Sequence, residues 1–217
     1  MKKTILITLF LGCLTSFASA GMKAGVTVSG FALDASGNES KTSGTDVQRA
    51  SEEIEGATGS LFIEYSPDLL GNRISFGVDV VPYDIDMGSV SNVRNGATLG
   101  NQNNQSGTNS ASVEMEMPVT AYVLIPSEQG LYLKAGVSHA NLSISESITT
   151  QSQYPDEEIY GFHGNIGYEH DFDTMFVRAE LGYSEWVPVT VTSSSRRMTI
   201  EGELEGTTAR ISIGTSF

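Results

Sequence analysis

The sequence ends in ARISIGTSF, residues 209–217, and side chains of two kinds alternate along this stretch. Alternation with a period of two is typical of a β-strand that has one face in an apolar environment. The polar or small residues between them would lie on the other face. The apolar face of this predicted strand is formed by Ala209, Ile211, Ile213, Thr215 and Phe217.

The same alternation recurs in seven earlier segments, so the sequence predicts eight strands. The first of these segments has the weakest alternation. The segments lie near residues 24–28, 61–65, 74–80, 115–125, 131–137, 160–168 and 175–183.

A water-soluble sandwich also alternates, with its apolar faces turned inward, so alternation alone does not fix the orientation of the strands. In the last strand the apolar face stops at Thr207 and continues as Glu205, Glu203 and Glu201. Most apolar runs span about 7–11 residues, close to the length with which a tilted strand crosses a bilayer. The opposite faces are rich in Gly, Ser and Thr, which suits a narrow lumen. We therefore expect an all-β fold, an eight-stranded antiparallel up-and-down transmembrane β-barrel.

Aromatic residues mark the ends of the apolar runs. Tyrosine and tryptophan favour membrane interfaces, because the ring lies in lipid while the hydroxyl or indole N–H reaches the headgroups. The predicted aromatic girdle consists of Tyr65, Tyr160, Tyr168, Tyr183 and Trp186.

The first twenty residues are predicted to be a secretory signal peptide. Lys2 and Lys3 precede a short apolar run over 5–14, and small residues at 18–20 offer a cleavage site. A lipoprotein signal with Cys13 as the lipidated residue is the alternative. We expect residues 21–217 to form one barrel domain, which lacks cysteine and hence disulfides. The net charge of −14 argues against a nucleic-acid partner.

Short and long connections alternate between the predicted strands. The short ones lie near residues 66–72, 127–130 and 170–173, and the long polar ones near 35–52, 88–111, 149–157 and 192–198. Strict alternation places the short turns on the periplasmic side and the long loops outside, with both termini periplasmic.

The C-terminal pattern, the leader and the eight strands together resemble small Gram-negative outer-membrane barrels of the OmpA, OmpX and OmpW kind. The resemblance implies an outer-membrane location, contact with outer-membrane lipid and lipopolysaccharide, and insertion by the barrel assembly machinery. It also implies that Ala209, Ile211, Ile213, Thr215 and Phe217 form the assembly signal. We expect a monomer.

The polar faces predict an ion-pair cluster in the lumen. An eight-stranded barrel is only wide enough for side chains to fill its interior, and buried charges there must be paired. Lys134, Arg178 and Arg210 are expected to neutralise Glu116, Glu180 and a neighbour, which would plug the lumen. A gated conductance pathway is the alternative. The candidate cluster consists of Glu64, Asp79, Glu116, Lys134, His163, Glu169, Arg178, Glu180 and Arg210.

The expected function is a non-enzymatic surface role: membrane structure, adhesion, or interaction of the external loops with a surface receptor or protein partner. A narrow porin-like channel is the second reading, and an outer-membrane lipid-modifying enzyme is the third. His139 lies beside Ser138, but adjacent strand residues point to opposite faces, so we expect no catalytic pair there. We expect no metal site and no cofactor.

Overall fold

The computed structural model describes residues 21–41, 47–67, 74–94, 107–147, 154–193 and 198–217. The predicted signal peptide, residues 1–20, lies outside them, as do parts of the predicted loops. No helix in the described residues is long and apolar enough to span a membrane. The strands are β1 (Met22–Lys41), β2 (Val47–Tyr65), β3 (Ser75–Val80), β4 (Ile85–Arg94), β5 (Gly107–Pro126), β6 (Leu131–Ser147), β7 (Glu157–Phe172), β8 (Met175–Thr192) and β9 (Met198–Ser216).

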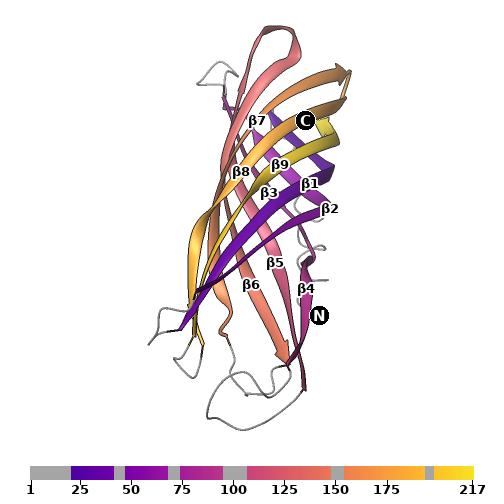
Figure 1. Cartoon of the computed structure of the whole chain (residues 1–217). Coiled ribbons are helices and arrows are strands. Elements are labelled where there is room, and N and C mark those ends of the chain that lie inside the picture. Colours follow the sequence, from indigo (N-terminus) through magenta and orange to yellow (C-terminus); the bar gives the residue numbers. More distant parts are fainter. Residues whose placement is uncertain (1–20, 42–46, 68–73, 95–106, 148–153, 194–197) are drawn as a thin grey trace.

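All strand pairs are antiparallel, and the sheet closes on itself (Figure 1). The order is β3-β2-β1-β9-β8-β7-β6-β5-β4, and β3 also pairs with β5. Because β3 and β4 lie one after the other along the same side of β5, they act as one interrupted strand. The closed eight-stranded barrel predicted from the sequence is therefore confirmed.

The interruption between β3 and β4 faces an irregularity in β5. Pro82 lacks an amide hydrogen, so it cannot donate to a ladder. Opposite it, Met117 has a φ of 39°, and the ladder between β5 and β6 shifts register between Glu116 and Val119. The Val81 amide still donates to the Pro118 carbonyl at 3.0 Å. This β-bulge reverses the two faces of β5, which has consequences for the predicted lumen residues.

Large apolar side chains cover the outside of the barrel at the end where the C-terminus lies, which is the upper end in Figure 1. Val28 and Leu181 are each 65% exposed and Ile211 is 59% exposed, although all three lie inside regular strands. A sandwich would bury these side chains between its sheets, whereas here they point away from the lumen. We call this outer surface the apolar belt. It faces the lipid.

The sequence predicts strands of about twenty residues over 131–148, 174–192 and 198–217, and β6, β8 and β9 have that length. Strands β1, β2, β4 and β5 extend further than the sequence predicts. Residues 35–41, 47–52, 88–94 and 107–111, which were predicted to lie in long loops, are strand. These segments are mostly polar and show little apolar alternation, so the sequence pattern does not mark them as strands. Backbone hydrogen bonds to the neighbouring strands hold them in the sheet. The connections that remain, 42–46, 95–106, 148–153 and 194–197, lie outside the described residues.

Beyond the apolar belt the sheet divides into two ribbons. One contains β2, β1, β9 and β8, and the other β6, β5 and β4. Figure 1 shows them diverging toward the lower left and the lower right. The division follows from β7, which begins only at Glu157, so that the end of β8 pairs with β9 alone. We call this part the outer extension: residues 34–41, 47–55, 85–94, 107–116, 141–147, 185–192 and 198–205.

Candidate functional site

Arg178 lies at the centre of the polar lumen. Its guanidinium meets the Glu64 carboxylate at two points, with Nη1–Oε1 at 2.5 Å and Nη2–Oε2 at 2.6 Å. Its Nε donates to Glu169 Oε2 at 2.5 Å. The Phe176 ring lies 4.6 Å from its Cζ, so the cation is enclosed by an aromatic face as well as by carboxylates. Such two-point pairing fixes the position of a buried guanidinium.

A second group of ion pairs surrounds Glu180. Lys134 Nζ lies 2.5 Å from Glu180 Oε1, and Arg210 Nε lies 3.3 Å from Glu180 Oε2. Arg210 also pairs with Asp79. Lys134 and Glu180 are each at most 4% exposed in their side chains, so both charges depend on protein partners.

Two tyrosine hydroxyls extend the network. Tyr122 donates to Glu64 Oε1 and Tyr132 to Glu180 Oε1, each at 2.8 Å. The Tyr132 ring lies directly over Gly167, where an added Cβ would come within 2.3 Å of the ring. A glycine at this position therefore makes room for the ring, and sequence alternation alone does not reveal that pairing.

The charges inside the lumen balance, apart from the exposed Asp171, whose carboxylate lies 3.9 Å from Lys23 Nζ. Lys23 pairs with Glu169 and adds a fourth cation to Lys134, Arg178 and Arg210. These four cations face four carboxylates, Glu64, Asp79, Glu169 and Glu180. Sequence reasoning missed Lys23, although the alternation of the first strand places it on the same side as the buried Thr27.

His163 points inward but joins none of these ion pairs. Its Nδ1 lies 3.3 Å from the Ser138 hydroxyl, which also meets the Thr120 hydroxyl at 2.7 Å. Its buried Nε2 has no hydrogen-bond partner.

Glu116 is not a lumen residue, and its prediction was wrong. It is exposed on the outside of β5, while its neighbour Met115 is 3% exposed inside. The bulge at 117–118 adds a residue to the strand and exchanges the two faces. Lys134 and Arg210 pair with Glu180 and Asp79 instead.

Trp186 does not belong to the aromatic girdle, so that prediction was also wrong. It packs inside the barrel against the apolar cluster. Its ring lies over Gly161 of the neighbouring strand, where an added Cβ would come within 2.7 Å. The alternation of β8, which turns Arg178 and Glu180 inward, turns Trp186 inward as well.

The remaining girdle residues, Tyr65, Tyr160, Tyr168 and Tyr183, lie on the outer surface and are each 46% to 51% exposed. Tyr160 and Tyr183 lie toward the outer extension, and their hydroxyls donate to Glu158 and Glu205. Each hydroxyl thus meets a carboxylate at the end of the apolar belt.

The residues of the predicted assembly signal form the outer face at the C-terminal end of β9. Ile211, Ile213 and Phe217 are exposed there, and Phe217 N donates to Met22 O at 2.9 Å. Their role in assembly stays a prediction. The signal consists of Ala209, Ile211, Ile213, Thr215 and Phe217.

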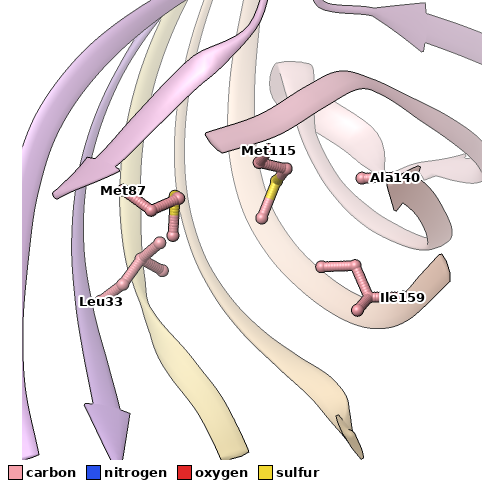
Figure 2. Packing of buried hydrophobic residues seen from close by; sticks show 5 residues of the cluster. All are labelled: Leu33, Met87, Met115, Ala140 and Ile159. Carbon is pink, nitrogen blue, oxygen red and sulfur yellow. The ribbon is translucent and has the colours of Figure 1, made fainter. Parts of the chain in front are cut away.

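An apolar cluster fills the barrel between the ion pairs and the outer extension. Five buried residues form its centre, and Figure 2 shows their side chains between the strands. Phe31, Ile54 and Trp186 are among the half-buried residues that pack around them. The lumen is therefore filled in two layers, one ionic and one apolar. The central residues are Leu33, Met87, Met115, Ala140 and Ile159.

Acidic residues end the apolar belt on nearly every strand. On β1, for example, the outward residues Val26 and Val28 are followed by Asp34, which pairs across strands with Glu53 and Glu205. Like charges placed directly opposite each other destabilise a sheet. We call these residues the acidic collar, and all are exposed: Asp34, Glu55, Asp86, Glu116, Glu158, Glu185 and Glu205.

Ser138 and His139, the adjacent pair considered for catalysis, lie on opposite faces of β6. His139 lies on the outside with its ring 5.0 Å from that of Tyr160, and its Nε2 is 3.8 Å from Glu158 Oε2. Ser138 points inward and contacts His163 instead. In the part of the chain that the structure describes, no group of three or more His, Cys, Asp or Glu residues is arranged to hold a metal ion.

A closed antiparallel barrel with an apolar belt, a polar lumen and tyrosines at the belt edges defines a small outer-membrane β-barrel protein of a Gram-negative bacterium. No protein-family model matches the sequence, and no curated protein sequence matches it. Solved structures do match the fold.

The outer membrane protein OprG from Pseudomonas aeruginosa is 12% identical, with 91% of this chain and 96% of that chain covered and a TM-score of 0.50. The attachment invasion locus protein Ail of Yersinia pestis is 10% identical over 88% of this chain and 99% of its own, with a TM-score of 0.39. The outer membrane protease OmpT from Escherichia coli is 10% identical over 93% and 98%, with a TM-score of 0.48. At 12% identity the similarity to OprG is one of fold.

Proposed function

We propose that the chain is a non-enzymatic surface protein that contacts partners outside the cell through its outer extension. Two features together carry this proposal: the lumen is filled with side chains, and the strands continue past the acidic collar. β8, for example, runs on to Thr192, although its belt ends before Glu185. A filled barrel with a projecting sheet is suited to presenting a surface rather than to passing solutes.

The filled lumen argues against the alternative of a narrow channel. A solute would have to separate Arg178 from Glu64 and then pass between Met87 and Met115. Opening a buried ion pair costs several kcal/mol in the absence of a replacement partner. Each of the four cations and four carboxylates inside the described lumen already has an oppositely charged partner.

The contact between Ser138 and His163 does not favour the enzyme alternative. A serine nucleophile needs a base within hydrogen-bond reach and access for substrate. Ser138 and His163 are near each other, but Ser138 is 6% exposed and lies inside the barrel wall.

We propose that the protein contacts lipid and lipopolysaccharide as structural surroundings.

The test is bacterial attachment. The full-length chain is produced in a Gram-negative host, and attachment to a cultured epithelial monolayer and to other bacteria is compared with an empty-vector strain at matched surface levels. We expect attachment to increase several-fold, and to fall when residues 95–106 are replaced by a short glycine-serine connection. Attachment equal to that of the empty-vector strain in both assays would contradict the proposal.

A further inference from the structure

β2 has a free edge in the outer extension. On the side away from β1 it pairs with β3 only from Leu61 to Tyr65. From Val47 to Ser60 no strand within the described ranges pairs with this side, and β4 pairs only with β5. The barrel wall is therefore open along the line between β2 and β4.

The sequence explains why these two edges do not join. Continuing the register of Leu61 with Val80 would place Pro82 opposite Gly59 and Asp86 beside Glu55. The proline has no amide hydrogen to donate, and the two carboxylates would repel each other. The Tyr83 hydroxyl instead accepts a hydrogen bond from the Gly59 amide.

The Gly59 bond also shows which backbone groups face the opening. In an antiparallel strand, alternate residues direct both amide and carbonyl to the same side. Since the Gly59 amide points away from β1, those of Ala57, Glu55 and Glu53 do too. The side chains of Glu55 and Glu53 are exposed beyond the apolar run of β2, so this part of the edge meets water rather than lipid.

We propose that the edge of β2 from Glu53 to Ala57 binds an extended segment of a partner protein as an added strand, and that this segment alternates basic and apolar residues. The inference rests on the proposed function, which it makes more specific. Strand addition to an exposed edge gives affinity through main-chain hydrogen bonds and specificity through alternate side chains.

The side chains on each face of the opening define the segment. Outward-pointing side chains of an added strand would lie beside Glu53 and Glu55, with Asp86 across the opening, which favours lysine or arginine. Inward-pointing side chains would meet the rim of the apolar cluster at Ile54 and Ile85. Basic residues at every second position, with apolar residues between them, satisfy both faces.

The same charges disfavour other occupants. A second copy of the chain paired edge to edge would bring Glu53 and Glu55 against identical carboxylates. The chain's own segments 42–46 and 95–106 contain no lysine or arginine. An acyl chain cannot hydrogen-bond the backbone groups of the edge.

The test uses residues 21–217 in phosphatidylcholine nanodiscs and a capped synthetic peptide that alternates lysine and valine. Binding is followed by amide chemical shifts of the isotope-labelled barrel, with empty nanodiscs as the blank. We expect shifts centred on Glu53, Glu55 and Ala57. The double variant E53Q/E55Q should weaken binding about fivefold, as expected for two exposed ion pairs.

Three comparisons make the test decisive. The variant E201Q/E203Q, with two exposed glutamates on β9 neutralised, should bind as the unaltered chain does. A peptide with glutamate in place of lysine, and one methylated on alternate amide nitrogens, should both lose binding. Equal binding by E53Q/E55Q or by the methylated peptide, or shifts confined to other strands, would overturn the inference. Cell attachment that persists at full strength in E53Q/E55Q would overturn the inference while leaving the proposed function intact.

Discussion

Arg178 on β8 and Glu64 on β2, which are 114 residues apart in sequence, form a two-point ion pair inside the barrel. The two strands are separated by β1 and β9, so the pair joins parts of the wall that are not neighbours. Around it, four cations and four carboxylates fill the inner half of the lumen.

Removing one partner of this pair should destabilise the barrel strongly. Glu64→Gln leaves the Arg178 guanidinium with one fewer carboxylate, which we expect to lower the free energy of unfolding by about 3 kcal/mol. Urea unfolding in lipid vesicles measures this loss. Glu203→Gln, on the exposed side of β9, should change it by less than about 0.5 kcal/mol. Equal effects of the two variants would show that the pair contributes nothing.

The contact of Tyr132 with Gly167 should be intolerant of a methyl group. An added Cβ would lie 2.3 Å from the Tyr132 ring, so Gly167→Ala should destabilise the barrel by about 2 kcal/mol through overpacking. Gly164 is the matched control, because a Cβ there meets nothing within 4 Å. If Gly167→Ala and Gly164→Ala unfold at the same urea concentration, the ring does not occupy the position described.

The apolar cluster should stabilise the outer half of the barrel. Met115→Ala removes a side chain that is 3% exposed, and we expect a loss of about 2–3 kcal/mol from the cavity it leaves. Val187 on the outside of β8 is 46% exposed, and Val187→Ala should be nearly neutral. Both are measured by urea unfolding, and a neutral Met115→Ala would contradict the filled lumen.

Relief of repulsion in the acidic collar should stabilise the sheet. Asp34 lies directly opposite both Glu53 and Glu205, so Asp34→Asn should raise the free energy of unfolding by about 0.5 kcal/mol at low ionic strength. The gain should shrink in 1 M salt, because salt screens exposed charges. A gain that is equal at both salt concentrations would mean that repulsion is not its cause.

Much of the barrel follows from the sequence because strand alternation is simple where it is unbroken. From Val177 to Leu181, β8 alternates apolar and charged residues, so the sequence predicts that Arg178 and Glu180 point inward, and both are buried. Glu116 was assigned to the wrong face because a bulge changes the period by one residue and leaves no sequence signal beyond Pro118. The alternation of β8 places Trp186 on the inward face, so the sequence pattern itself argues against a place in the girdle.

Other features of the candidate site depend on register, which one sequence does not supply. The proximity of Arg178 to Glu64 arises from a contact across the lumen between strands that are not neighbours. The contact of Tyr132 with Gly167 depends on the register between β6 and β7. The open edge of β2 depends on where β3 ends relative to Leu61. Pro82 is a local sequence signal of that ending, whereas the repulsion between Asp86 and Glu55 becomes visible only once the register is known.

The direction in which each strand face points is tested most directly by contacts between methyl groups and lipid. Isoleucine and leucine methyl groups of the unaltered chain are labelled in nanodiscs, and nuclear Overhauser effects to acyl-chain protons are recorded. Ile211 and Leu181 should show strong effects, whereas Ile159 and Leu33, of the same residue types, should show none. Strong lipid contacts at Ile159 and Leu33 with none at Ile211 and Leu181 would contradict the account.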